Sequence, residues 1–227
     1  MDFNNIIRLI FETLGMTLIS TVLAYIVGMP IGILLNVTSK NGLKPNKVLN
    51  QIVGIIVNVL RSIPCLIIVV IAMPAVRAIF GVGSGKWYTM LIPLFLASFG
   101  FVARMVEQSL SEVPNGEIEA VKSLGATNFQ IIYKVLIPES RSSLLSGLAV
   151  VLVSVLGYTS FAYNIGAVGL ISGIWEFYAR NTASYLESPY FWVLIIIVIV
   201  VVQIIQELGL YLAKKIDKRR RITIWKN

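Results

Sequence analysis

The chain has 227 residues, of which 57% are hydrophobic and only 13% are charged. A soluble domain of this length carries about a quarter charged residues, and the uncharged runs here exceed the roughly 18 residues that mark a transmembrane helix, so the composition excludes a soluble protein. The chain has no histidine and one cysteine, which excludes histidine-based zinc sites, serine–histidine triads and a disulfide framework. The net charge of +8 comes from basic residues that flank the apolar runs, and it does not indicate a nucleic-acid surface.

Five apolar stretches are predicted to cross the membrane, so we expect an all-α membrane protein in which residues 1–227 form one domain. The stretches are residues 6–36, 50–80, 87–111, 138–161 and 189–212. An odd number of spans places the two ends of the chain on opposite sides. The connections 37–49 and 112–137 and the C-terminal tail carry most of the basic residues, the tail through Lys218, Arg219, Arg220 and Arg221. By the positive-inside rule, we expect the N-terminus outside and these connections and the tail in the cytoplasm.

The first two spans contain residues that disfavour a straight helix. Pro30 lies near the cytoplasmic end of the first span, where proline removes one backbone hydrogen bond. In the second span, Pro64 disfavours helical backbone at Ile63. Residues 48–60 could therefore form a separate interfacial helix, with the true membrane crossing beginning near Ser62.

Arg61 is an ionisable residue at or near membrane depth, where a charge costs roughly 2.5–3.5 kcal/mol at a helix centre. Together with Ser62 it is a candidate for a transport pathway, in which the guanidinium could meet a substrate carboxylate. The alternative is that Arg61 contacts lipid headgroups or the cytoplasm. In the third span, Arg104 and Glu107 lie three residues apart on one helical face, and we expect them to form a structural ion pair.

The connection 112–137 is polar but is patterned like two short helices. Apolar residues of the first helix are spaced to share one face, namely Ile118, Val121 and Leu124, and those of the second are Phe129, Ile132 and Val135. Gly125 suits the left-handed residue that ends a helix. Thr127, with Gln130 three residues later, has the capping-box pattern that begins the next helix, and Pro138 fits the first turn of the fourth span. Such a helix pair can fit a groove on a partner; the alternative is an interfacial helix without a partner.

This loop resembles the cytoplasmic docking loop of bacterial ABC-importer permeases. Glu119, Ala120 and Gly125, followed by the apolar–proline pair Ile137-Pro138, have the spacing of that motif. Val121 stands where the family usually has a second alanine, and because both residues are apolar, we expect docking to survive. The resemblance implies a coupling loop that sits in a cleft of an ATP-binding subunit. The residues assigned to it are Ile118, Glu119, Ala120, Val121, Leu124, Gly125, Ala126, Thr127 and Pro138.

Further segments resemble the methionine-importer permease subunit, and the likeness extends from about Glu12 to the basic tail. These segments are residues 58–64, 103–107, 125–127 and 157–158. The resemblance implies a type I importer fold in the bacterial inner membrane and a homodimer of five-span subunits. It also implies two ATP-binding subunits and an extracytoplasmic substrate-binding lipoprotein. ATP and Mg²⁺ would be used by the partner ATPase, so we expect no cofactor on this chain and no enzymatic activity of its own.

The end of the fourth span and the glycine-rich turn after it hold further candidate pathway residues. These are Ser154, Tyr158, Phe161 and Asn164, of which Phe161 could act as an apolar gate beside a dimer axis. The alternative is packing, because small hydroxyl residues in membrane helices commonly serve interhelical contacts. The run 81–86 is not a phosphate loop, because it has three residues between its glycines instead of four and Trp87 follows its lysine.

These features lead to an interpretation as the membrane-spanning subunit of an ATP-driven importer for methionine, with tolerance for D-methionine or close derivatives. A permease for another amino acid is the first alternative. An ion-driven carrier or channel is a second, against which stand the scarcity of intramembrane acids and the absence of a detectable inverted repeat. A membrane scaffold is a third, but it would need neither the broken helices nor the patterned loop. Lipid is expected as a further contact, and nucleic acid is not.

Overall fold

The computed structural model describes residues 3–217, and every regular element in that range is helical. The long helices are α1 (Phe3–Thr38), α4 (Leu91–Ser111), α8 (Arg141–Tyr158) and α10 (Pro189–Ile216). The shorter helices are α2 (Lys47–Ser62), α3 (Cys65–Phe80), α5 (Asn115–Ser123), α6 (Asn128–Ile131), α7 (Ile137–Glu139) and α9 (Leu170–Arg180). Short 3₁₀-helical and π-helical segments complete the described chain: η1 (Trp87–Met90), η2 (Ile132–Leu136), η3 (Thr159–Ile165) and η4 (Tyr185–Glu187). The basic residues 218–221, predicted to be cytoplasmic, lie outside the described residues.

The prediction of an all-helical membrane protein with five spans is confirmed. Four stretches are long and apolar enough to cross a membrane: Asn4–Thr38, Trp87–Ser111, Arg141–Ile165 and Pro189–Ile216. The fifth span consists of α2 and α3, which are bent by 102° against each other. The bend lies at Pro64, where Ile63 takes an extended backbone conformation with φ −78° and ψ 122°. The break expected from Pro64 is therefore present, and it separates two helices of equal length.

Helix α1 does not break at Pro30, in contrast to the expectation from the sequence. Its neighbouring glycines let it pack very closely along α4. A Cβ atom on Gly28 would lie 2.7 Å from the carbonyl oxygen of Phe99, and one on Gly32 would lie 2.5 Å from that of Ala103. We infer that this close packing holds α1 helical where proline removes a single hydrogen bond.

Helix α2 is attached to α4 by a polar cluster around Arg104. The guanidinium donates to Glu107 Oε2 at 2.6 Å, which confirms the predicted ion pair. It also donates to Asn58 Oδ1 at 2.9 Å and to the carbonyl oxygen of Gly54 at 3.1 Å, both on α2. The ion pair is therefore one part of a contact between two helices that are almost 50 residues apart in the sequence.

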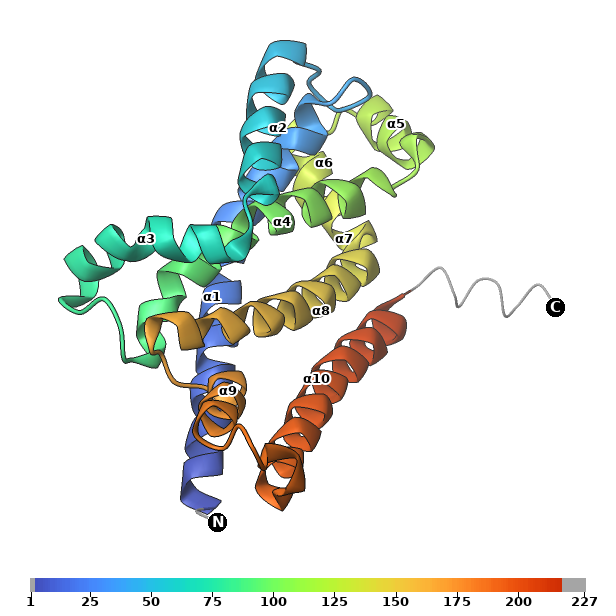
Figure 1. The fold of residues 1–227 in the computed structure, drawn as a ribbon. Helices are drawn as coiled ribbons and strands as arrows, with labels where there is room; N and C mark the ends of the chain where they lie inside the picture. Colours follow the sequence, from blue (N-terminus) through green and yellow to red (C-terminus); the bar gives the residue numbers. More distant parts are fainter. Residues whose placement is uncertain (1–2, 218–227) are drawn as a thin grey trace.

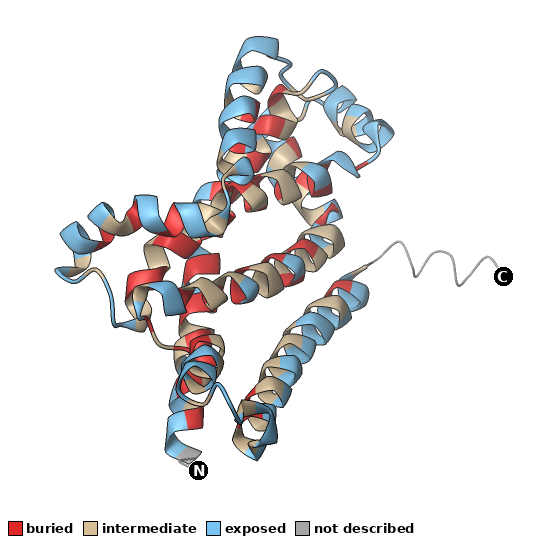
Figure 2. Ribbon diagram, viewed as in Figure 1, coloured by how far each residue is buried: buried red, intermediate tan, exposed pale blue. Residues whose placement is uncertain are grey.

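The main core lies where α1, α4 and α8 meet, and it contains the buried residues Met16, Ala24, Leu94, Val102, Val106, Val151 and Val155. Figure 1 shows α2, α5 and α6 near the C-terminal end of α1, whereas α9 and the start of α10 lie near its N-terminal half. Helix α10 packs on α8 and α9, and only 6% of its most apolar stretch is buried. Most of α10 is accordingly coloured as exposed or intermediate in Figure 2.

Candidate functional site

The helix pair predicted in the connection 112–137 is present as α5 and α6. Gly125 forms the turn between them with φ +82°, a left-handed conformation that favours glycine. Thr127 begins α6 with a complete capping box: its Oγ1 accepts from the N–H of Gln130 at 3.3 Å, and its own N–H donates to Gln130 Oε1 at 2.9 Å. Pro138 lies in the first turn of α7, not of α8, because the chain bends again at Ser140 before α8 begins.

One side of the helix pair is anchored in the protein. Ile118 and Val121 of α5, which were predicted to share one apolar face, both pack against the main core. From the second helix and the turn after it, Ile131 and Leu136 are fully buried in the same core. A displacement of the helix pair would therefore be transmitted directly to the residues between α1, α4 and α8.

The other side of the helix pair carries exposed apolar residues. Leu124, Phe129 and Tyr133 are 86%, 73% and 66% exposed, and we call these three the apical patch. The rings of Phe129 and Tyr133 stack with their centroids 5.8 Å apart. Leu124, predicted to share one apolar face with Ile118 and Val121, and Phe129, predicted to share one with Ile132 and Val135, lie instead on the exposed side. Leu124 follows the last residue of α5, and Ile131 takes the buried position in α6.

Glu119 and Ala120 are both exposed on α5. Among the described residues, Glu119 forms neither an ion pair nor a side-chain hydrogen bond, although Lys122 lies three residues further along the same helix. Ala126 packs against the main core, which fixes the turn beside Gly125. The motif residues therefore have two roles. Glu119 and Ala120 face outward, whereas Ile118, Val121 and Ala126 pack on the main core and hold the loop in place.

A groove of about 810 Å³ continues the apical patch along α1. Tyr25, Ile26, Met29, Pro30 and Ile33 of α1 form one wall, and Phe129, Ile132, Tyr133, Ile137, Pro138 and Arg141 form the other. Phe129 and Tyr133 belong to both the patch and the groove. Tyr133 was not named individually among the predicted docking residues, although its i,i+4 spacing from Phe129 on a polar segment was a usable signal.

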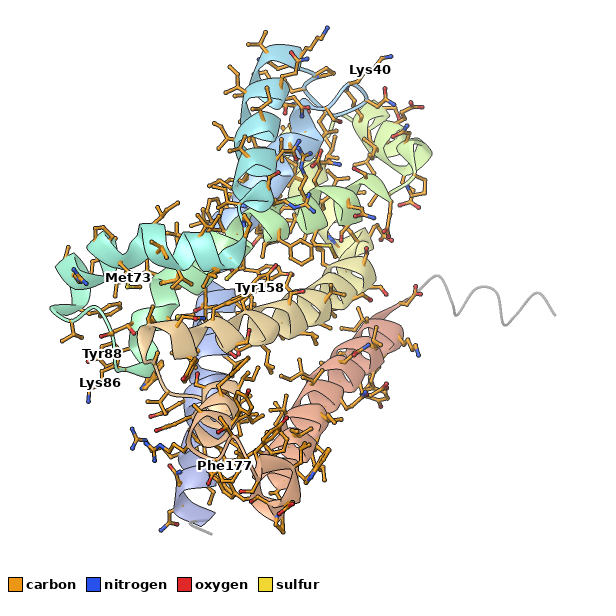
Figure 3. All side chains as sticks on the ribbon, in the orientation of Figure 1. Lys40, Met73, Lys86, Tyr88, Tyr158 and Phe177 are labelled. Atoms are coloured by element: carbon orange, nitrogen blue, oxygen red, sulfur yellow. The ribbon has the colours of Figure 1, made fainter. Side chains whose placement is uncertain are left out.

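The candidate pathway residues lie in two places. Arg61 and Ser62 are exposed at the end of α2, where the Arg61 guanidinium lies 5.7 Å from the ring centroid of Phe101 on α4. Tyr158 and Phe161 are half-buried at the end of α8 and in η3, where they pack against the main core. Figure 3 shows Tyr158 on the side of α8 that is turned toward α3. No described hydrogen bond or ring contact joins the two places.

The remaining polar candidates are bonded locally. Ser154 Oγ donates to the carbonyl oxygen of Val150 at 2.8 Å, and Asn164 Nδ2 donates to that of Phe161 at 3.4 Å. Within residues 3–217, no group of three or more His, Cys, Asp or Glu side chains is arranged to hold a metal ion.

Comparison with known proteins finds relatives along almost the whole chain. Residues 28–218 match the family described as "binding-protein-dependent transport system inner membrane component". The "Probable D-methionine transport system permease protein MetI" of Pasteurella multocida (strain Pm70) is 35% identical over 208 residues, which cover 92% of this chain and 94% of that protein. The "D-methionine transport system permease protein MetI" of Escherichia coli (strain K12) is 39% identical over 155 residues, covering 68% and 71% of the two chains.

Solved structures give the same result for the fold. A chain described under "Inward facing conformations of the MetNI methionine ABC transporter: CY5 SeMet soak crystal form" superposes with a TM-score of 0.87 at 33% identity. The alignment covers 94% of this chain and 97% of that one. The likeness therefore includes α1, the bent pair α2–α3 and the helix pair α5–α6, and is not confined to one motif.

Proposed function

Because the chain belongs to the family of binding-protein-dependent transport system inner membrane components, we propose that it is the membrane-spanning subunit of an ATP-driven importer for methionine, in the L or D form or as a close derivative. The observation that carries this proposal is an exposed, rigid helix pair with the docking-loop motif in a chain that is 35% identical to a MetI protein. The chain is the transport subunit, and a separate ATP-binding subunit uses ATP and Mg²⁺.

The proposed assembly contains two copies of this chain, two ATP-binding subunits and an extracytoplasmic substrate-binding lipoprotein. The named relative structure, MetNI, supports the association with an ATP-binding subunit. The large exposed apolar surface of α10 supports a second membrane-embedded copy. Glu119 and the apical patch are exposed on the helix pair α5–α6 and the turn after it, and they give the ATP-binding subunit a surface to contact.

In this mechanism, the coupling loop within 112–137 transmits closure of the ATP-binding subunits to the membrane. The outer side of the loop, with Glu119, Ala120 and the apical patch, contacts the ATPase. The inner side, with Ile118 and Val121, is packed in the main core, so its motion shifts α4 and α8. Gly125 and the Thr127 capping box keep the two helices at a fixed angle, which makes the loop a lever instead of a flexible connection.

The proposed translocation pathway runs beside the end of α8. Tyr158 and Phe161 form an apolar constriction near the dimer axis, with Ser154 and Asn164 beside it, and Arg61 and Ser62 contribute from the bend of the second span. A ligand shifts a conformational equilibrium only through different affinities for the two states. The state open to the cytoplasm therefore holds substrate weakly, so that substrate is released there.

The direct test of the substrate is uptake of radiolabelled L-methionine by cells that contain or lack this chain. Uptake should depend on the chain and should be competed by excess L- or D-methionine more strongly than by histidine, glutamine or leucine. Stronger competition by another amino acid would assign that amino acid as the substrate and leave the permease assignment intact. Uptake that persists without an ATP-binding subunit would instead favour an ion-driven carrier.

The docking role of the apical patch can be tested by a matched pair of substitutions. Phe129→Ala should reduce co-purification of the ATP-binding subunit at least fivefold, because truncation of an aromatic contact residue commonly costs about 1–2 kcal/mol or more. Val48→Ala is the control, since Val48 is 67% exposed at the start of α2 but lies outside the patch. An equal loss of ATPase in both variants would show that the patch has no special role in docking.

A further inference from the structure

The coupling loop is connected to the membrane helices differently at its two ends. At the first end, α4 leads into α5 through the short connection 112–114. At the second end, the chain passes through η2, which is π-helical, and through α7, and it bends at Ser140 before α8 begins (Figure 1). π-Helical segments are rare and are frequently found at functional sites. The second end is therefore an interrupted connection, at which a movement of the loop could be absorbed before it reaches α8.

The first end is held firmly, because the last turns of α4 are hydrogen-bonded to two other helices. Arg104 donates to Asn58 Oδ1 of α2 at 2.9 Å. Asn36 Nδ2 of α1 donates to Ser111 Oγ at 3.0 Å. A movement of α5 therefore passes directly into α4, and from α4 into α1 and α2.

A small hydrogen-bonded group joins the second end of the loop to the first. Ser143, in the first turn of α8, has its Oγ 3.0 Å from Glu112 Oε1 and 3.1 Å from Ser109 Oγ. Ser109 is buried in the last turn of α4, and Glu112 follows that helix directly. A carboxylate accepts hydrogen bonds, and a hydroxyl donates to it more strongly than to a neutral group. We call Ser109, Glu112 and Ser143 the clasp.

The clasp connects α4 and α8 without the interrupted segment. It closes the chain between residues 112 and 143, so that both ends of the loop are tied to each other. Further along α8, Val151 and Val155 also meet α4 in the main core, but apolar contacts are non-directional and tolerate sliding. Hydrogen bonds depend on distance and angle, so the clasp fixes the start of α8 against the end of α4.

We propose that Ser143 and Glu112 are positioning residues of transport, which make α8 follow α4 when the ATP-binding subunits close. This inference rests on the proposed importer function. Tyr158 and Phe161 lie at the opposite end of α8 and in η3. The clasp thus determines how much of the loop's movement reaches these candidate gate residues, and how much is lost at η2 and Ser140.

The test uses the complete transporter with its ATP-binding subunit in liposomes, together with its methionine-binding protein, and measures methionine taken up per ATP hydrolysed. Ser143→Ala should lower this ratio about fivefold, because the hydrogen bond that holds α8 to Glu112 is lost. Retention of the ATP-binding subunit should not change. Ser143→Thr keeps the hydroxyl group and should restore most of the ratio.

Ser142→Ala is the matched control for this measurement. Ser142 is the neighbouring residue and is also half-buried, but its Oγ donates to the carbonyl oxygen of Ala213 on α10 at 3.1 Å. Its ratio should equal that of the wild type. Equal ratios in Ser142→Ala and Ser143→Ala, with an active wild type, would overturn the clasp and leave the importer function intact. Absence of ATP-dependent methionine uptake by the wild-type complex would overturn the importer function and the role of the clasp with it.

A double substitution tests whether the two residues act as one unit. Glu112→Ala should lower the ratio by a factor similar to that of Ser143→Ala. The variant with both substitutions should be no worse than either alone, because residues of one hydrogen-bonded pair are not additive. If the two factors multiplied, Ser143 and Glu112 would act separately, in contradiction to the clasp.

Paired cysteines distinguish a permanent clasp from one that opens in each cycle. Ser109→Cys and Ser143→Cys, in a background with Cys65→Ser, place two thiols where the hydroxyl groups are 3.1 Å apart, so that oxidation can join them. The oxidised protein should take up methionine with the wild-type ratio, and reduction should lower the ratio because the bond to Glu112 is missing. Uptake that stopped on oxidation and returned on reduction would show that the two ends of the loop must separate, and the proposal would be wrong.

Discussion

A substitution at Gly125 tests the backbone conformation of the coupling loop alone, because a side chain at this position would displace no neighbouring atom. The φ of +82° at Gly125 disfavours side chains with a branched Cβ, yet no heavy atom lies within 4 Å of where a Cβ would be. A larger residue would therefore fit in space, and its effect would come from the backbone alone. Gly125→Val should cost about 1–2 kcal/mol in the left-handed conformation, and should reduce both methionine uptake and retention of the ATP-binding subunit.

The control for this prediction is asparagine at the same position. Asn tolerates the left-handed region several-fold better than most residues, so Gly125→Asn should retain most of the uptake that Gly125→Val loses. Membrane insertion, measured by the yield of folded protein, should be equal in the two variants. If asparagine and valine reduced uptake equally, the turn conformation would not be what the loop requires.

Local signals predicted the backbone of this loop well but not the direction of its side chains. The capping box of Thr127 and the left-handed Gly125 depend on residues within one turn, so the sequence contains the information for them. The orientation of Leu124 and Phe129 depends on how α5 and α6 rest on the main core. That arrangement uses residues outside the loop, such as Leu43 and Leu110, which line one cavity together with Ile118 and Leu136, and periodicity within the loop does not contain it.

The packing of α1 on α4 shows a similar limit for a whole element. Pro30 indicates a break, but the glycines on either side bring α1 so close to α4 that the helix continues. Gly32→Ala should disturb this contact, because the new Cβ would lie 2.5 Å from the backbone oxygen of Ala103, which cannot rotate away. We expect a loss of about 1–3 kcal/mol, seen as a melting temperature several degrees lower for the purified protein.

Gly116→Ala is the matched control for this prediction. A Cβ on Gly116 meets nothing within 4 Å, and this helical glycine has an ordinary backbone conformation. The melting temperature of Gly116→Ala should equal that of the wild type or exceed it slightly, because alanine is favoured over glycine in a helix by about 1 kcal/mol. Equal destabilisation by both substitutions would contradict the close packing of α1 on α4.

For the bent pair α2–α3, the position of the break was predictable from the sequence, but the angle between the two helices was not. The rule that a residue before proline avoids helical backbone was enough to locate the break at Ile63. The angle of 102° was not predictable, because it depends on where α2 is held. Asn58 and Gly54 accept hydrogen bonds from Arg104 on α4, and no short-range pattern connects these residues.

At the scale of the whole molecule, α10 is the element that the single chain leaves incomplete. It rests on α8 through Gly209, which lies against Ala149, and Ala213, whose carbonyl oxygen accepts from Ser142 Oγ, while its other sides are largely exposed. Gln203 and Glu207 are exposed on the side away from α8, and neither makes a hydrogen bond or ion pair with another described residue. Gln203 is about 21 Å along the helix from Pro189 at 1.5 Å per residue, so it lies well inside the span.

Polar groups at this depth are costly against hydrocarbon, where a charge costs roughly 2.5–3.5 kcal/mol near the helix centre. We therefore expect this side of α10 to face a second copy of the chain or the water of the pathway in the assembled transporter, and not lipid. Spin labels attached to cysteines at positions 203 and 207, in a background with Cys65→Ser, should collide with dissolved oxygen less often than a label at position 208. Leu208 is 57% exposed at the same depth but points about 100° away from Glu207 around the helix. Oxygen is concentrated in the acyl chains, so a label at Gln203 as accessible to oxygen as one at Leu208 would place this side of α10 against lipid and contradict the expected dimeric arrangement.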